Sequence, residues 1–340
     1  MSFRAALIVC WFGRLPKYID IWMKSVSYNK EFEFLLFTDD DTRIEHPDNV
    51  KIIPFNLEEL KERIHKSIIK NPNLNKPYRI CDFRPMFGKI FYKELQLYDF
   101  WGYCDLDIVF GKLSKFITEK QLENYDAIFN GGHFSLIRNT FEMNHLYEKA
   151  GGLFDYKTVA KKDAIFAFDE ITGIQRISQK NNMRALYHIP YIESEVKYSQ
   201  LRSMLDCTNP KNQAFYWEKG ELFRVKKKEE ETLYQKIAYI HLQKRKLDID
   251  QSGGKIEDSF WIKPTGFERK EYYGVPRDKD IIDKNPYNES YLRESSHYRK
   301  NKVCSILRRK PYQIYVRVKQ QIGGINREHG KMKEYVWEKF

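Results

Sequence analysis

The chain has 340 residues, of which 42% are hydrophobic, so it can bury the core of one large domain or two smaller ones and is not disordered as a whole. No run of residues approaches the ~18–20 uncharged apolar positions that a membrane span needs, and the polar-flanked first eleven residues are too short for a signal peptide. Five scattered cysteines without a Cys-x-x-Cys pair indicate neither a disulfide framework nor a zinc cluster. We therefore expect a cytoplasmic protein.

The net charge of +12 is concentrated near the C-terminal end. From Arg299 onward, twelve Lys and Arg face three Glu, which gives +9 and leaves +3 for residues 1–298. Basic charge can attract nucleic acid, anionic lipid or phosphorylated substrates. Because the charge is terminal and lacks a recognisable nucleic-acid motif, we expect no nucleic-acid partner.

The N-terminal part alternates predicted strands and helices. Apolar strands are predicted at residues 5–12, 32–37 and 50–53, with helices at 19–27 and 57–69. This rhythm favours a parallel, doubly wound sheet, in which ligands bind at the carboxyl ends of strands. The residues that occupy such ends, and that could stack on a base or accept a hydrogen bond from a ribose, are Trp11, Phe12, Gly13 and Asp39.

A helical stretch interrupted at Pro85 is predicted at residues 78–99. It carries Asp82, Arg84 and Lys89, and its cations could hold a diphosphate. A helix face whose basic residues are only solvated explains the same pattern.

Residues 101–111 read Trp-Gly-Tyr-Cys-Asp-Leu-Asp-Ile-Val-Phe-Gly, and the apolar run predicts a buried strand. Side chains alternate faces along a strand, so Asp105 and Asp107 would point the same way. Two like charges on a buried face are costly unless a positive group neutralises them. Mg²⁺ or Mn²⁺, which favour carboxylate oxygen, would do so. The alternative is a strand end whose aspartates cap a turn.

Further candidates follow in the second half of the predicted domain. Asp169 and Glu170 lie in an apolar setting, where burial would raise a carboxylate pKa toward that of a working base. An acidic helix N-terminus is the alternative. A strand predicted at 237–246 contains His241 and ends in a basic cluster with Lys244 and Lys246, so a nitrogen ligand would lie beside cations suited to phosphate. A satisfied core histidine is the bland alternative. Other strands are predicted at 126–129 and 187–192, and a hairpin at 215–224.

Residues 266–340 form a polar, basic extension. A helix is predicted to begin at Pro311, with Ile314, Tyr315, Val318 and Ile322 on one face. Such a basic, amphipathic helix is typical of binding to an anionic membrane surface. Packing of this face on the main domain is the alternative.

Several of these motifs together resemble GT-A-fold, nucleotide-sugar-dependent glycosyltransferases, and are similar to bacterial capsular or cell-surface polysaccharide biosynthesis proteins. The matching pieces run in order across residues 1–265, at 37–40, 81–85, 101–107, 132–134 and 240–242. The resemblance implies a Rossmann-like mixed, mostly parallel sheet flanked by helices for residues 1–265. Residues 266–340 would then be a basic, largely helical C-terminal extension.

The resemblance also implies roles for individual residues. Asp105, Asp107 and His241 would bind Mn²⁺ or Mg²⁺ together with the donor diphosphate, and Asp105 would also lie near the donor ribose. A basic residue ahead of the aspartates, Arg84 or Lys89, would contact the donor, and Asp82 in the same segment is also expected to bind it.

The acceptor side is implied more loosely. His133, after the glycine pair at 131–132, would contact the acceptor. Asp169 or Glu170 would deprotonate the acceptor hydroxyl if the reaction inverts, and would only position the acceptor if it retains.

We therefore expect a metal-dependent enzyme that moves a sugar from a nucleoside-diphosphate donor to a growing cell-surface glycan of capsular or O-antigen type, or to its lipid-linked precursor. It would work in the cytoplasm or peripherally at the inner face of the membrane. One alternative is a sugar-phosphate nucleotidyltransferase, although residues 11–17 match its glycine-rich loop poorly. The other is a non-catalytic scaffold of envelope assembly.

Overall fold

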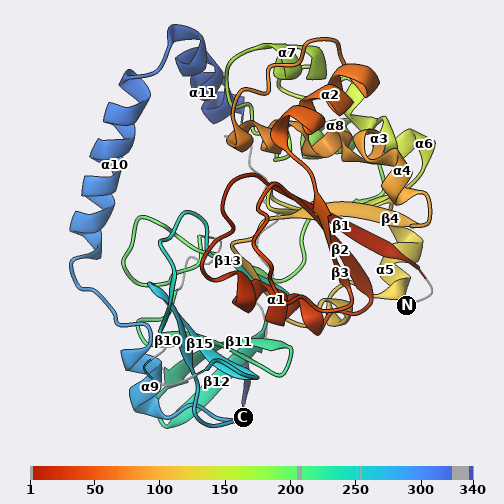
Figure 1. Ribbon diagram of the computed structural model, residues 1–340. Helices are drawn as coiled ribbons and strands as arrows, with labels where there is room; N and C mark the ends of the chain where they lie inside the picture. The colour runs from red at the N-terminus through yellow and green to blue at the C-terminus, as the bar shows by residue number, and fades with distance from the viewer. Residues whose placement is uncertain (1–2, 205–208, 251, 253–254, 324–336, 340) are drawn as a thin grey trace.

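The computed structural model describes residues 3–204, 209–250, 252, 255–323 and 337–339. Within these residues the strands form two seven-stranded sheets and one three-stranded sheet. In Figure 1 the first sheet lies under a thick layer of short helices, and the second sheet lies at the opposite end of the molecule.

The first sheet has the order β3-β2-β1-β4-β7-β6-β8. Its parallel half consists of β1 (Ala5–Trp11), β2 (Phe32–Thr38), β3 (Val50–Pro54) and β4 (Phe100–Cys104). The other half consists of β7 (Phe134–Arg138), β6 (Ala127–Asn130) and β8 (Ala185–Leu186), with β7 antiparallel to both β4 and β6. The predicted strands at 5–12, 32–37 and 50–53 are confirmed, and the sheet is mixed rather than wholly parallel.

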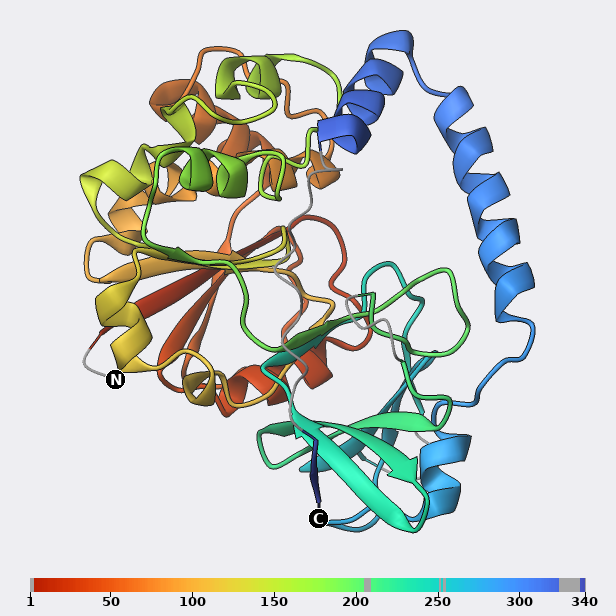
Figure 2. The same cartoon turned by 180° about the vertical axis from the view of Figure 1, so that it is seen from behind.

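Helices cover both faces of this sheet. This burial removes from water the side chains of β1 and β2, which are apolar on both sides. One face packs on α1 (Ile19–Ser27) and α5 (Glu119–Asn124), and the other on a helical layer. This helical layer, seen from both sides in Figures 1 and 2, consists of α2 (Leu57–Ser67), α3 (Phe87–Ile90), α4 (Tyr92–Leu95), α6 (Phe141–Asn144), α7 (Tyr156–Lys161) and α8 (Ile174–Lys180).

The predicted helix at 78–99 is replaced by short pieces. Residues Pro77–Met86 form a 3-10 helix, η1, and α3 and α4 follow it. Pro85 removes a backbone donor inside the segment, which disfavours a continuous α-helix. Two further 3-10 turns are η2 (Leu113–Lys115) and η3 (Leu146–Glu148).

The prediction of one strand across residues 101–111 is wrong. β4 ends at Cys104, and β5 (Ile108–Phe110) belongs to a small sheet of order β5-β13-β9, with β13 (Tyr239–His241) and β9 (Tyr191–Glu193). The turn between β4 and β5 is held at both ends: Asp105 N donates to His133 O at 3.1 Å, and Leu242 N donates to Asp107 O at 2.8 Å. The aspartate pair therefore marks the point where the chain passes from one sheet to another.

The second sheet is largely antiparallel, and the sequence predicted only its central hairpin. Its order is β14 (Asp248–Asp250), β16 (Gly266–Arg269), β15 (Ser259–Lys263), β10 (Gln213–Glu218), β11 (Glu221–Lys228), β12 (Glu231–Lys236) and β17 (Glu338–Lys339). β10 and β11 confirm the hairpin expected at 215–224. The expected boundary at residue 265 falls inside the β15–β16 hairpin.

The C-terminal extension begins with β16 and includes β17, and the described residues between these two strands contain three helices. These helices are α9 (Asp278–Asp283), α10 (Tyr291–Leu307) and α11 (Pro311–Gly323). In Figures 1 and 2, α10 runs along one edge of the molecule from α9 to the helical layer, where α11 lies. Among the described residues, none of the helices combines the length and hydrophobicity that crossing a bilayer requires. Parts of the predicted basic tail lie outside the described residues, namely Arg327, Lys331 and Lys333.

Candidate active site

Asp105, Asp107 and His241 converge where β4, β5 and β13 meet. Their ligand atoms all lie within 4.8 Å of one another. His241 Nε2 lies 3.3 Å from Asp107 Oδ1 and 3.8 Å from Asp105 Oδ2. The structure thus brings together the three residues proposed as metal ligands, although the aspartates reach this position from a turn rather than from one strand face.

The position of His241 follows from the pairing of β13. In register, His241 lies opposite Ile108 of β5 on one side and Glu193 of β9 on the other. Its Nδ1 lies 3.0 Å and 3.1 Å from the two carboxylate oxygens of Glu193, so Nδ1–H donates to Glu193 and Nε2 is turned toward the aspartates. A carboxylate that holds the second nitrogen in this way is typical of metal-binding histidines.

His133 lies behind His241 rather than in an acceptor site. Its ring stacks on that of His241 with 4.2 Å between centroids, and its Nε2 lies 3.1 Å from the Tyr239 hydroxyl. It is buried, and burial lowers its pKa, as do the charges of His241 and Arg84. The expected direct contact of His133 with an acceptor is therefore corrected to a packing role, because the ring is 6% exposed and covered by its neighbours.

Arg84 lies between two carboxylates. Its Nη2 contacts Asp105 Oδ1, and its Nη1 donates to Asp169 Oδ2 at 3.1 Å and to Gly132 O at 2.6 Å. These contacts raise the pKa of Arg84 against the effect of burial and keep it charged. The cation expected to hold a diphosphate thus lies beside the aspartates, where it partly neutralises them.

Asp169 and Glu170 differ in their surroundings. Asp169 is 1% exposed, and burial raises its pKa, with further contributions from nearby carboxylates. Its Oδ1 is buried and has no hydrogen-bond partner within the described residues. Glu170 is exposed. The two pack against Gly132, where a Cβ would lie 2.8 Å from Glu170 Cγ and 2.9 Å from Asp169 Oδ2, so this position requires glycine.

Asp82 does not lie in the site. Its side chain is fully buried, pairs with Arg79, and accepts backbone N–H groups of Phe166 and Phe168 at 3.1 Å. A carboxylate without exposed surface cannot contact a donor, so the donor-binding prediction for Asp82 is corrected. Its role is to hold the segment that leads to Asp169.

A cavity lies at the carboxyl ends of β1 and β2. It has a volume of about 580 Å³, and Gly13, Asp39 and Asp40 line it. Gly13, with φ of +91°, donates its N–H to Asp39 Oδ1 at 2.6 Å. Hydrogen bonds from Thr42 and the Leu15 N–H lower the pKa of Asp40 to about 2.

The two aromatic residues expected beside this cavity take part in other contacts. Trp11 donates its indole N–H to Arg14 O at 2.9 Å, and Phe12 packs near Phe55 with 6.4 Å between ring centroids. Neither is among the residues that line the cavity. Their stacking on a base stays a prediction.

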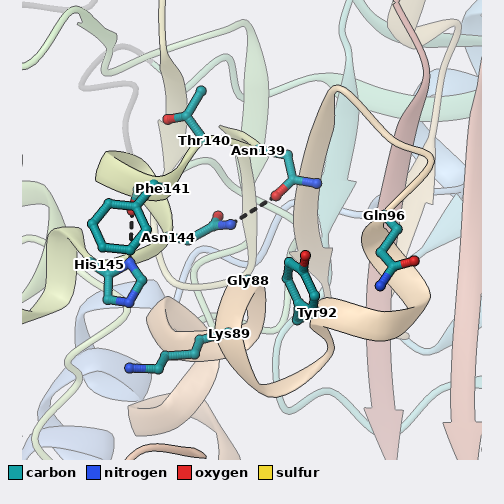
Figure 3. Close-up of a pocket in the computed structure, with 9 residues that line it drawn as sticks. All are labelled: Gly88, Lys89, Tyr92, Gln96, Asn139, Thr140, Phe141, Asn144 and His145. Atoms are coloured by element: carbon teal, nitrogen blue, oxygen red, sulfur yellow. Dashed lines mark hydrogen bonds between the residues drawn. The ribbon is translucent and has the colours of Figure 1, made fainter.

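Lys89 is remote from the aspartates. It lines a cavity of about 830 Å³ together with Tyr92, Asn139 and Phe141 (Figure 3). Asn139 N donates to Asp99 O, which precedes β4, so this cavity lies at the end of β4 opposite to Asp105. The structure therefore does not bring Lys89 together with the aspartates, as its expected contact with the donor would require.

Lys244, by contrast, lies near the site. Its Nζ is 5.3 Å from the ring centre of Tyr78, whose pKa is raised to about 12 by burial and by nearby groups that include Glu170, Asp169 and Asp105. Contact of Lys244 with the donor stays a prediction.

Sequence reasoning missed Glu193, Tyr239 and Tyr18. Glu193 follows directly on a predicted strand at 187–192, as His241 follows Ile240, but their pairing depends on which strands are neighbours. The pKa of Tyr18 is raised by burial and by the charges of Asp107 and Asp105.

The residues fit a divalent cation. Two carboxylates and one imidazole nitrogen form a mixed oxygen and nitrogen set that suits Mn²⁺ or Mg²⁺. Burial raises the pKa of Asp105, as does its neighbour Asp107, while Arg84 opposes this shift. A pair of carboxylates in this situation gains from an added positive charge. A second group that shares a ligand with the first, His133, Glu193 and His241, lies directly behind it.

Comparison with known proteins gives a family but no activity. A family model matches residues 7–271, and its description is a family of unknown function (DUF6625). No curated protein matches the sequence. One similar solved structure is described as a glycosyltransferase involved in the glycosylation of the major capsid of PBCV-1; it is 8% identical with a TM-score of 0.31, over 56% of this chain and 85% of that chain. A similarity at this level carries no weight for the activity.

Proposed function

We propose that this chain, which belongs to a family of unknown function (DUF6625), is a metal-dependent glycosyltransferase that uses a nucleoside-diphosphate sugar. One observation carries the proposal. The Asp105–Asp107–His241 cluster and the cavity at Gly13 and Asp39 lie at the same edge of the first sheet. In register, Ile8 pairs with Tyr103 and Trp11 with Thr38, so both sites follow the carboxyl ends of adjacent parallel strands.

The two sites divide the donor between them. The cavity at β1 and β2 would take the nucleoside, with the Asp39 carboxylate as an acceptor for its hydroxyl or amino groups. The diphosphate would lie at the aspartate cluster. When bound there, Mn²⁺ or Mg²⁺ would act as a Lewis acid for the leaving nucleoside diphosphate.

The chain's own residues orient the reacting groups. Arg84 fixes Asp105 through a direct contact, and Glu193 fixes His241. Lys244 supplies a positive charge at the edge of the site. Preorganised charges of this kind act where negative charge develops in the transition state.

Of the two candidate bases, exposure favours Glu170. It is exposed beside Gly132, so it can reach an acceptor hydroxyl, while Asp169 is buried and bound to Arg84. If the reaction inverts, Glu170 would accept the hydroxyl proton and Asp169 would position the guanidinium. If it retains, Glu170 would orient the acceptor.

The acceptor we propose is a growing cell-surface glycan of bacterial type or its lipid-linked precursor, used at the inner face of the membrane. Support comes from the sequence resemblance and from the basic C-terminal helices. A sugar-phosphate nucleotidyltransferase and a scaffold without activity are the competing functions.

Calorimetry and donor hydrolysis test the proposal. Nucleoside diphosphates and nucleotide sugars should bind more tightly with Mn²⁺ or Mg²⁺ than in EDTA, and hydrolysis should release nucleoside diphosphate. Pyrophosphate chemistry would identify a nucleotidyltransferase instead. If nucleotide affinity is equal with and without metal and no turnover occurs, the non-catalytic scaffold is the remaining function.

A further inference from the structure

Helix α11 has two faces with different surroundings. Val316 and Gln320, one helical turn apart, are buried against the body of the protein. Gln313 and Gln320 donate side-chain N–H groups to Asp163 O at 3.1 Å and Ile165 O at 3.3 Å. Lys310, just before the helix, pairs with the Asp163 carboxylate at 3.0 Å. The inner face of α11 therefore holds the chain immediately before Asp169.

Residues 163–170, called here the acid segment, are gripped from two sides. α11 binds the carbonyl groups at its start, and the buried Asp82 carboxylate accepts the N–H groups of Phe166 and Phe168. Between them Ala167 adopts a φ of +48°, which a non-glycine residue rarely takes without support. The position of Asp169 and Glu170 thus depends on contacts made by α11.

The outer face of α11 carries an exposed apolar stripe. Its members, called the α11 stripe, follow the spacing i, i+3, i+7 and therefore share one side of the helix. They are exposed by about half or more: Tyr315 by 52%, Val318 by 47% and Ile322 by 66%. These are three of the four residues predicted to share the apolar face of this helix; the fourth, Ile314, is half-buried, and within the described residues the packing of α11 leaves the other three exposed.

The two C-terminal helices that include the stripe are strongly basic. Residues 291–323, which contain α10 and α11, have nine Lys and Arg against one Glu, a net charge of +8. Between the two helices Arg308 and Arg309 are exposed, while Lys310 pairs with Asp163. An apolar stripe on a helix of a basic segment matches an anionic lipid surface, where the stripe enters the interface and the exposed cations remain at the headgroups.

We propose that the outer face of α11 docks on an anionic lipid bilayer, and that its inner face links this docking to the order of the acid segment. Docking needs no donor and no metal, so it stands apart from the glycosyltransferase assignment. Its benefit to catalysis rests on the proposed function, because a lipid-linked acceptor would arrive at the surface that orders Glu170.

Vesicle sedimentation tests the docking step. The full chain should co-sediment with phosphatidylglycerol vesicles at low salt, bind phosphatidylcholine vesicles weakly, and be released at high salt, since exposed charges are screened within about 10 Å at 0.1 M salt. The double variant Val318→Ser/Ile322→Ser should bind vesicles roughly tenfold more weakly or worse, because two apolar side chains that would enter the bilayer interface are lost. Phe141→Ser is the matched control, since Phe141 is 81% exposed on a different helix.

Hydrogen exchange tests the link to the acid segment. Anionic vesicles should slow exchange of the amides at 163–170 in the parent chain, without donor or metal present. Gln313→Ala/Gln320→Ala should still bind vesicles but lose most of this protection, because both hydrogen bonds from α11 to carbonyl groups of the segment are gone and only the Lys310–Asp163 pair remains.

Each remaining outcome overturns part of the proposal. Equal vesicle binding by the parent and the stripe variant would exclude the outer face as the docking site. A concentration-dependent dimer that the stripe variant abolishes, without vesicle binding, would mean that a second copy covers the stripe. Exchange at 163–170 that vesicles leave unchanged would remove the link and leave docking alone. None of these readouts depends on glycosyl transfer, so failure of the proposed function is distinguishable.

Discussion

Replacing Glu193 by glutamine should weaken metal binding without unfolding the protein. The carboxylate of Glu193 has 13% of its side-chain surface exposed, and it accepts from His241 Nδ1 at 3.0 Å and 3.1 Å. It also lies 3.4 Å from His133 Nδ1. The substitution keeps the shape of the side chain but removes the charge that orients the His241 ring.

The size of the effect follows from these contacts. A hydrogen bond to a charged group contributes about 1.5–3 kcal/mol, and loss of such a partner behind a metal ligand typically costs about 10–100-fold in metal affinity. We expect the Kd for Mn²⁺, measured by calorimetry in the presence of a nucleoside diphosphate, to rise within that range, while the melting temperature of the metal-free protein changes little.

Glu221→Gln provides the matched control. Glu221 pairs with Lys115 and Lys236, and it has 21% of its side-chain surface exposed on a different sheet. Mn²⁺ affinity should be unchanged in this variant. A Kd for Glu193→Gln within about twofold of the parent value would refute the role of Glu193 as a positioning residue.

Four further outcomes are expected. Asp107→Asn should abolish the metal dependence of nucleoside-diphosphate binding in calorimetry, and a persisting dependence would exclude Asp107 as a ligand. Glu170→Gln should lower turnover by roughly 10²–10⁴-fold with donor binding intact, and Asp169→Asn by less, whereas full activity of Glu170→Gln would rule out the base. Burial lowers the pKa of His241, but neighbouring carboxylates raise it by more, so metal binding must displace a proton. Metal affinity should therefore increase with pH until that pKa is passed. Calorimetry in two buffers would detect the released proton, and pH-independent affinity would contradict this expectation. Truncation after Tyr298 should lower the melting temperature, because α11 packs on the body, and an unchanged value would contradict that packing.

Local patterns in the sequence were enough to predict the parallel half of the first sheet. The runs that became β1, β2 and α1 carry continuous or periodic apolar residues whose burial depends little on which neighbour they meet. The aspartate pair was also visible locally, because carboxylates inside an apolar run stand out whatever the backbone does. His241 could be proposed as a ligand only because the predicted strand that contains it runs on into a basic cluster.

Features that depend on strand partners escaped prediction. Nothing local shows that the chain leaves the first sheet at Cys104 and joins β13 more than a hundred residues later. The contact of Glu193 with His241 follows only from the parallel pairing of β9 with β13. Exposure separated Asp169 from Glu170, and burial removed Asp82 and His133 from direct contact, which single-residue chemistry could not show.

The turn between β4 and β5 has a consequence for unfolding. Asp105 and Asp107 belong to the end of the first sheet, whereas His241 belongs to a small sheet that also leans on β10, since Trp217 donates to Phe110 O at 2.8 Å. A cation bound by all three would cross-link segments far apart in the chain. At a hundred times its Kd it would stabilise the folded state by about 2.7 kcal/mol, and only while both halves of the site stay folded. Bound metal would therefore couple the unfolding of the first sheet to that of the small sheet, so that the two unfold in one cooperative transition.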